Sequence, residues 1–287
     1  MTGTTAAPRS LPVTIVGAEA GPLPHAIDAR WLMAYAAGLG EHDARYFDTT
    51  APAGVAAHPL FAVCYEWPLA LAVRASTMAP EIWPLGVHAT HRLVIHRPPR
   101  AGDTLTTTAR VVAAEPRRAG TLLTVRYVTV DAAGAPVTTT DYGSVYRGVT
   151  LDGGAAVGVT TPREAPAAGD VEWEEPVSIA AEAAHVYTEC ARIWNPIHTD
   201  LAVARAAGLP GIILHGTATL ALGVSRVLQH AGADPRRVRG VAGRFTGMVP
   251  MPSRLTVRGR PRAGDVITFD VLGEDGRPVL AGGEVTL

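Results

Sequence analysis

The chain of 287 residues carries 25 basic and 26 acidic side chains, which give a formal net charge of −1 at pH 7. It is long enough for one large domain or for two, and its basic residues form no stripe of the kind that a nucleic acid or an anionic membrane surface requires. The two cysteines, Cys64 and Cys190, lack metal-ligand spacing, and no apolar run approaches the roughly 18 residues of a membrane span, so we expect a reducing, cytoplasmic setting.

The first half is predicted to place two helices before a series of strands. A short helical stretch lies within 35–48 ("YAAGLGEHDARYFD"), and a longer apolar helix follows over 58–77, interrupted near Pro68. Farther on, 121–130 ("TLLTVRYVTV") alternates apolar and polar residues as a strand does. The segment 151–170 is rich in Gly, Ala and Pro and has no periodicity, which predicts a linker.

The second half repeats this layout. A polar motif at 187–200 precedes an apolar helix over 214–230, and "EDG" at 274–276 predicts a hairpin turn near the C-terminus. Helices followed by antiparallel strands suit an α+β arrangement, in which a sheet packs against a helix.

Three blocks of sequence recur in the same order, offset by 152 to 162 residues. Such a recurrence predicts a duplicated domain, with copies at 1–150 and 171–287 and the linker at 151–170. The blocks are 35–48 with 187–200, "AHPLFAV" from 57 with "LHGTATL" from 214, and "PRAGD" at 99–103 with "PRAGD" at 261–265.

The segment "RIWNPIHTD" (192–200) places an amide, a rigid proline and an imidazole within four residues. Together with "ILHGTATLALG" (213–223), it resembles the G-D-x-N-P-x-H segment and the histidine-glycine pair of the MaoC-like, or hydratase 2, family. The segment 244–265 resembles the strand that carries the substrate-side wall in that family. The resemblance implies an α+β double hot-dog fold: two tandem repeats, each an antiparallel sheet wrapped around a central helix, with their sheets forming one surface.

The same resemblance implies substrates that are acyl thioesters of coenzyme A or of acyl carrier protein, and no cofactor beyond the coenzyme A of the substrate. Family members add water to an enoyl double bond or remove it, using an Asp and a His that share one water and an Asn that orients it. Because the duplication supplies a pair of domains within one chain, we expect a pseudo-dimeric monomer or a homodimer, with no nucleic-acid or membrane partner.

Carried over position by position, the family's His falls on His198, its Asn on Asn195 and its oxyanion-hole glycine on Gly216. The family's Asp falls on Ile193, and the glycine before it falls on Arg192. Isoleucine cannot transfer a proton, and the loss of a positioned acid or base lowers a rate by roughly 10²–10⁴-fold. His198 and Asn195 also have a purely structural interpretation, as polar groups that stabilise a turn.

The gap-free overlay of the two repeats yields a second candidate site in the first half. Glu41 aligns with the position of the missing Asp, Asp43 with that of the Asn, and Tyr46 with that of the His. In this site Asp43 would be the base and the Tyr46 hydroxyl a donor, with Glu41 nearby. The structural alternative is that the three residues are only helix caps and polar groups on the protein surface.

Three classes of function fit these residues. Hydrolysis of an acyl-CoA is favoured, because a thioesterase needs a polarised carbonyl and a positioned water but no proton transfer at the α-carbon. The first alternative is an enoyl-CoA hydratase or 3-hydroxyacyl dehydratase, which would have to recruit another acid, for instance from the first half. The second alternative is non-catalytic binding of an acyl thioester.

Overall fold

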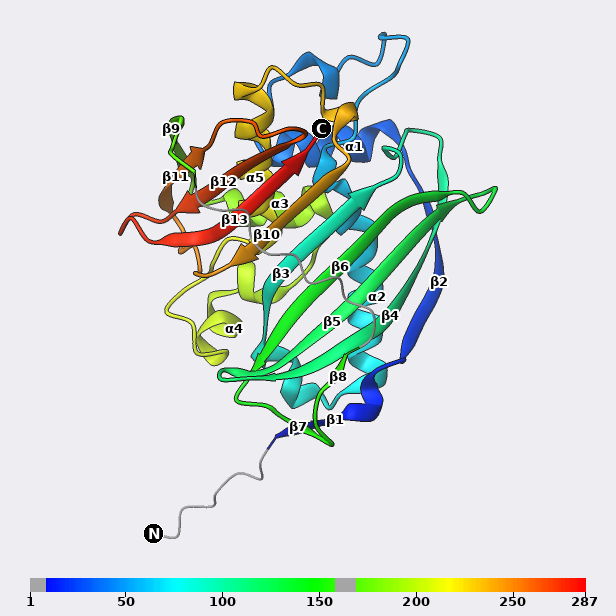
Figure 1. The fold of residues 1–287 in the computed structure, drawn as a ribbon, viewed down its shortest axis with the longest axis vertical. Helices are drawn as coiled ribbons and strands as arrows, with labels where there is room; N and C mark the ends of the chain where they lie inside the picture. The colour runs from blue at the N-terminus through cyan, green and yellow to red at the C-terminus, as the bar shows by residue number, and fades with distance from the viewer. Residues whose placement is uncertain (1–8, 158–168) are drawn as a thin grey trace.

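Two copies of one helix-and-strand arrangement share a single sheet of eleven strands. The computed structural model describes residues 9–157 and 169–287. In Figure 1 the strands run side by side across the front of the molecule, and the helices α2 (Ala62–Thr77) and α5 (Gly216–His230) lie behind them.

The elements of the two halves follow in chain order. The first half contains β1 (Ser10–Pro12), β2 (Glu19–Ala26), α1 (Ala29–Gly38), α2, β3 (Gly86–Ile95), β4 (Thr104–Arg117), β5 (Gly120–Asp131), β6 (Pro136–Arg147), β7 (Thr150–Asp152) and β8 (Ala156–Val157). The second half contains β9 (Trp173–Ile179), α3 (Ala183–Ala191), α4 (Leu201–Ala206), α5, β10 (Gly240–Phe245), β11 (Ser253–Gly259), β12 (Val266–Leu272) and β13 (Pro278–Thr286). Single turns of 3-10 helix cover, among others, Ala44–Tyr46, Pro59–Phe61 and Pro196–His198.

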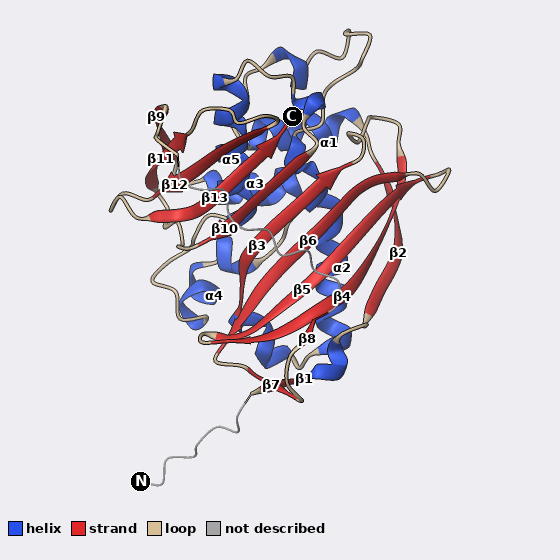
Figure 2. Cartoon of the chain, viewed as in Figure 1, coloured by secondary structure: helices blue, strands red, loops and turns tan. Residues whose placement is uncertain are grey.

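The strand order is the same in both halves. The path through the sheet is β2-β4-β5-β6-β3-β10-β13-β12-β11-β9, with β8 attached to β4. From each outer edge the path ends at β3 or β10, and each of these is the second strand of its half to enter this sheet along the chain. The two strands pair antiparallel at the centre, with Val94 opposite Gly240. The predicted duplication and the α+β double hot-dog fold with continuous sheets are therefore confirmed (Figure 2).

Both central helices predicted from the sequence are observed. The first begins with the 3-10 turn Pro59–Phe61, continues as α2 and contains Pro68, and the second is α5. Most residues of both helices are buried, as expected for a helix that a sheet encloses. Within residues 9–157 and 169–287, no helix has the length and apolar character needed to cross a membrane.

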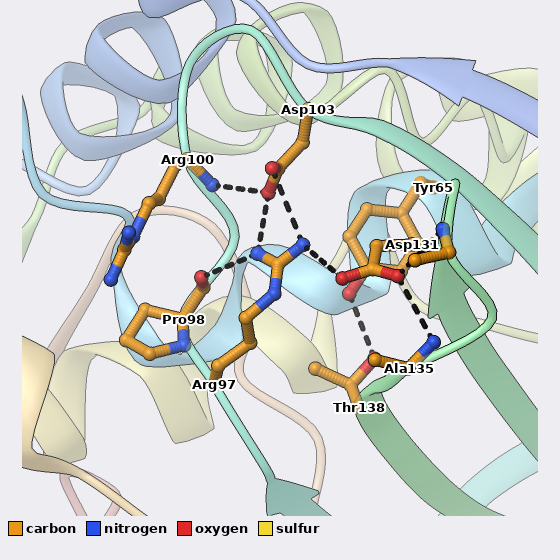
Figure 3. A network of polar contacts seen from close by, with 9 residues as sticks. Tyr65, Arg97, Pro98, Arg100, Asp103, Asp131, Ala135 and Thr138 are labelled. Carbon is orange, nitrogen blue, oxygen red and sulfur yellow. Dashed lines mark hydrogen bonds and ion pairs between the residues drawn. The ribbon is translucent and has the colours of Figure 1, made fainter.

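Two consecutive residues anchor α2 to the strand β6. The Tyr65 hydroxyl lies 2.8 Å from the Thr138 hydroxyl, a contact drawn in Figure 3. The Thr140 hydroxyl donates a hydrogen bond of 2.5 Å to the carboxyl of Glu66. Because a buried polar group without a partner costs about 1–3 kcal/mol, these bonds fix the rotation of the helix against the sheet.

The turn between β3 and β4 contains the first "PRAGD" block and is held by ion pairs. Figure 3 shows the Arg97 guanidinium between two carboxylates, 2.7 Å from Asp103 and 3.2 Å from Asp131. The glycine of the block, Gly102, has φ +93°, and its counterpart Gly264 in the second block has φ +59°. Left-handed backbone favours glycine, so the repeated sequence corresponds to a repeated turn.

The two halves also meet where equivalent tyrosines face each other. The hydroxyls of Tyr35 on α1 and Tyr187 on α3 are 3.3 Å apart, and both side chains are buried. At the same interface, a Cβ on Gly38 would lie 2.7 Å from the Cβ of Cys190, so the glycine permits the close approach of α1 and α3. The repeat therefore builds an internal two-fold-like interface.

Part of the segment predicted as a linker pairs with the first half. The strand β7 pairs in parallel with β1, and β8 pairs with β4. Leu151, inside β7, packs against the hydrophobic core, which explains why this stretch is ordered despite its glycines. Residues 158–168 of the predicted linker lie outside the described residues.

Replacing Gly223 with alanine is expected to destabilise the protein, although the same change in an ordinary helix interior stabilises by about 1 kcal/mol. A Cβ at this position of α5 would lie 2.3 Å from the ring of Phe269, which is fully buried on β12. Overpacking of this kind costs about 1–3 kcal/mol, so we expect a net loss of stability in urea unfolding. Replacing the Phe269 ring with the smaller leucine side chain, in the double variant Gly223→Ala/Phe269→Leu, should recover part of the lost stability. An unchanged or higher urea midpoint in Gly223→Ala would contradict the packing argument.

Candidate active site

The Asn-Pro-x-His segment follows a left-handed residue at the end of α3. Arg192 has φ 59° and ψ 35°, and its N–H bonds the carbonyl of Thr188. A residue with a side chain pays about 1–2 kcal/mol for this conformation, which glycine adopts freely. The Arg192 guanidinium lies 4.1 Å from the ring centroid of Trp31, and this cation–π contact offsets part of the cost. Arg192 thus adopts the left-handed conformation that glycine favours, although the family's glycine is absent.

His198 is a buried, neutral imidazole whose tautomer is fixed. Its Nδ1 lies 2.8 Å from the carbonyl oxygen of Ile213, and a carbonyl can only accept, so Nδ1 carries the proton. Burial lowers the pKa of His198 to about 4, against an opposing effect of this hydrogen bond. At neutral pH, Nε2 is therefore an unprotonated base.

A second histidine, His215, packs against His198. The His215 ring stacks on the His198 ring with centroids 3.7 Å apart, and its Nε2 lies 3.3 Å from the Thr188 hydroxyl. Burial lowers the pKa of His215 well below its usual value, and the neighbouring His198 lowers it further. A neutral pair of stacked rings holds the base in position without adding charge to the site.

The central helix α5 begins at Gly216, directly after His215. The first N–H groups of a helix have no partner within the helix and carry the positive end of its dipole, so they suit a carbonyl oxygen that gains negative charge. A Cβ on Gly216 would lie 3.2 Å from the ring of Phe245. The glycine thus keeps this helix end close to the wall formed by β10.

One cavity connects these residues with the first half. It encloses about 1040 Å³ of empty space, its open mouth included. The second half contributes Asn195, His198 and Gly216 to its wall, together with Ile193, the residue at the position of the family's Asp. The first half contributes Val63, Glu66, Trp67, Ala70 and Arg74, which follow one face of α2, and His88, Tyr127 and Tyr142 from the sheet.

Glu66 was not among the residues predicted from the sequence. It is buried, it is the one carboxylic acid among the described residues that line this cavity, and burial raises its pKa to about 8. At neutral pH it is largely protonated. A lone glutamate inside the apolar run "AVCYEWPLALAV" is the signal that could have revealed it.

The predicted first-half residues lie elsewhere. Asp43 caps the turn Ala44–Tyr46 and pairs with Arg45, whose hydrogen bond lowers the pKa of the carboxyl. Tyr46 is buried, which raises its pKa. Glu41, whose pKa burial raises, lies 3.8 Å from Nε2 of His58, the counterpart of His215. Glu41 and Tyr46 lie beside His58. The wall described above contains none of the three predicted residues.

No metal-binding cluster is found in the part of the chain that the structure describes, since no three His, Cys, Asp or Glu side chains there are grouped as ligands. In the cavity wall, the second half presents an imidazole, an amide and a helix N-terminus. The first half presents apolar and aromatic side chains together with Glu66, Arg74 and His88.

The fold is that of a double hot-dog protein. Residues 164–268 match the MaoC like domain, and residues 14–140 match the FAS1-like dehydratase domain region. The second half therefore contains a MaoC like domain, as the sequence motif predicted, and the first half matches a dehydratase region of another family model.

Curated relatives are similar over a short segment. The fatty acid synthase beta subunit pkiC of Emericella nidulans is 40% identical over 73 residues, and the fatty acid synthase subunit beta of Aspergillus oryzae is 41% identical over 81 residues. These segments are 25% and 27% of this chain but only 4% of each synthase subunit.

Solved structures of similar fold extend over nearly the whole chain. A MaoC-like dehydratase from Phytophthora capsici has a TM-score of 0.83 at 22% identity and covers 96% of this chain and 97% of its own. The peroxisomal multifunctional enzyme type 2 of Drosophila melanogaster has a TM-score of 0.75 at 25% identity, covering 94% of this chain and 48% of its own. A Lactobacillus plantarum protein provisionally described as an oleoyl thioesterase has a TM-score of 0.55 at 10% identity, and the match covers 94% of this chain and 95% of its own. Both matched families are named for dehydratases, so the comparisons do not support the preference for hydrolysis.

Proposed function

We propose that this chain adds water to the double bond of an enoyl thioester, or removes it from a 3-hydroxyacyl thioester. One observation carries the proposal. A neutral imidazole (His198), a helix N-terminus (Gly216) and a protonated carboxyl (Glu66) line the same cavity, although the carboxyl comes from the other half of the chain. These are the base, the oxyanion site and the acid that the reaction needs.

In the proposed hydration, the thioester carbonyl lies at the start of α5 and Asn195 orients a water beside the double bond. Nε2 of His198 accepts a proton from the water, whose oxygen bonds to C3. The π electrons of the double bond move toward the carbonyl oxygen, where the Gly216 N–H stabilises the negative charge. The Glu66 carboxyl then donates its proton to C2, and the electrons return from the carbonyl oxygen to form the C2–H bond. The imidazolium returns its proton to the glutamate through cavity water, and dehydration follows the reverse path.

Glu66 compensates in this proposal for the carboxylate missing at position 193. Ile193 is buried and lines the cavity, so the position still faces the substrate but cannot exchange a proton. Its apolar side chain also lowers the polarity around His198, in keeping with the lowered pKa of that ring. An acid of raised pKa is suited to donate a proton near neutral pH.

Thioester hydrolysis is the second candidate, and Ile193 is the observation that favours it. Hydrolysis needs a water held by Asn195 and His198 and an oxyanion site at Gly216, but no acid at C2. A thiolate leaves readily, so little help from a general acid is required. In this case Glu66 would contribute only to the binding of the acyl group.

A panel of saturated and enoyl-CoA thioesters separates the two reactions. Purified protein is incubated with each, and the enoyl absorbance and the free thiol are followed in parallel. Loss of enoyl absorbance without thiol release supports hydration. Thiol release from saturated and enoyl substrates alike supports hydrolysis and would refute the first candidate, and neither signal with any member would refute both.

The pH dependence of the rate is expected to be bell-shaped, with an unusually wide plateau between its acid and alkaline limbs. His198 must be neutral and Glu66 protonated, so activity should rise through a pKa of about 4 and fall through a pKa of about 8. The measurement is kcat/KM for an enoyl thioester across this range. In Glu66→Gln the rate should fall by roughly 10²-fold or more and the alkaline limb should disappear. Glu115→Gln, a change at a carboxyl outside the cavity, should leave both limbs in place; an alkaline limb that persists in Glu66→Gln would contradict the role of this residue.

A further inference from the structure

The cavity wall contains a cation without an acidic partner. Arg74 lies in the last turn of α2 and its guanidinium stands over the ring of Trp67, 5.5 Å from the centroid. Tyr146 is one of the tyrosines that raise the pKa of Arg74, against the opposing effect of burial. Among residues 9–157 and 169–287, no carboxylate forms an ion pair with Arg74.

The one acid in the wall cannot neutralise this charge. Glu66 lies eight residues earlier on α2, which places it about 12 Å away along the helix axis at 1.5 Å per residue. Burial also keeps its carboxyl largely protonated at neutral pH. The wall of the cavity therefore carries a net positive charge, and a cation that is half-buried without a counter-ion is unfavourable.

The surroundings of Arg74 suit an anionic group at the end of a chain. Arg74, Tyr127 and Tyr142 line both the main cavity and a smaller space beyond it, which Tyr146 and Ser144 also border. Four residues with hydroxyl groups thus line the spaces that Arg74 also lines. Between this end and the base His198, the face of α2 offers the apolar side chains of residues such as Val63 and Ala70.

We propose that Arg74 binds a carboxylate at the far end of the acyl chain, so that the substrates are monothioesters of dicarboxylic acids. This inference rests on the proposed function, because it assumes that the thioester carbonyl lies at Gly216. A planar guanidinium pairs with a carboxylate through two parallel hydrogen bonds, and such charge-assisted bonds are stronger than those between neutral groups. The methylene groups of the chain would then lie along α2.

The test measures binding without chemistry. Coenzyme A thioethers that end in a carboxylate and thioethers of equal chain length that end in a methyl group are titrated into the protein by calorimetry. Neither series contains a thioester, so neither can be hydrolysed or hydrated. We expect the wild type to bind the best carboxylate-ended ligand roughly 10-fold or more tightly than its methyl-ended partner.

Variants assign this preference to one residue. Arg74→Gln should abolish it, Arg74→Lys should retain part of it, and Arg110→Gln, a change at an exposed arginine outside the cavity, should leave it intact. Thermal unfolding of each variant checks that the fold is preserved, and Arg74→Lys serves if Arg74→Gln unfolds. Equal or tighter binding of the methyl-ended series by the wild type overturns the inference, as does failure of every thioether to bind. A carboxylate preference in a protein that turns over no thioester would overturn the proposed function but leave the carboxylate site at Arg74 standing.

Discussion

Replacing His198 with alanine is expected to lower kcat for the preferred thioester by roughly 10²–10⁴-fold. Both candidate reactions take a proton from water, and His198 is the buried neutral base in the cavity, with Nδ1 bound to the Ile213 carbonyl and Nε2 left to accept. KM should change little, because the imidazole contributes to the transition state more than to the binding of coenzyme A. Steady-state kinetics of the folded variant measures both constants.

The control for this experiment is His96→Ala, which changes an exposed histidine outside the cavity and should keep full activity. Asp43→Asn tests the other predicted site, since Asp43 pairs with Arg45 away from the cavity. Comparing the two variants shows which of the two candidate sites carries the reaction. Full activity in His198→Ala together with loss of activity in Asp43→Asn would move the reaction to the first half.

Replacing Ile193 with aspartate is expected to raise the rate of enoyl hydration by roughly 10²-fold or more, the range attributed to one positioned acid or base. The preceding residue, Arg192, already has the left-handed conformation that the family's glycine favours, and Ile193 lines the cavity. A carboxylate there could share a water with His198, as the family resemblance implies. It would also raise the pKa of that histidine, because a nearby negative charge favours the imidazolium.

The cost of this substitution is a buried carboxyl group, for which a loss of about 1–3 kcal/mol in unfolding free energy is expected. The matched control is Ile193→Asn, because asparagine has nearly the same shape as aspartate and is also polar but cannot transfer a proton. Crotonyl-CoA hydration is followed for both variants by the decrease in enoyl absorbance. An equal gain in both, or none in either, would show that the missing carboxylate does not limit hydration.

The fold could be predicted from the sequence because its signals are local and repeated. The apolar runs of the two central helices, the alternation in 121–130 and the two "PRAGD" turns each follow from residue type and spacing. The duplication then set the arrangement of the second half. The strands β7 and β8 were missed, since they depend on pairing with the distant strands β1 and β4 rather than on periodicity.

The candidate site was predicted only where a contiguous motif carried it. Asn195, His198 and Gly216 lie on one short segment and the start of the next helix, and the structure brings all three to one cavity. Glu66 and Arg74 were missed because they enter that cavity from a helix of the other half, more than a hundred residues away in the chain. A sequence pattern describes neighbours along the chain, whereas this contact depends on how the halves pack.

The fusion of the two halves through β3 and β10 also changes what natural selection can do with each helix. The alignment of the blocks that begin at 57 and 214 places Glu66 opposite Gly223, so one structural position holds a buried acid in α2 and a glycine packed on Phe269 in α5. In an ancestral homodimer, a single codon would have specified both positions, and any gain in one helix would have been imposed on the other. In a fused chain two separate codons specify the two positions, so one helix can hold a buried acid while the other keeps its packing.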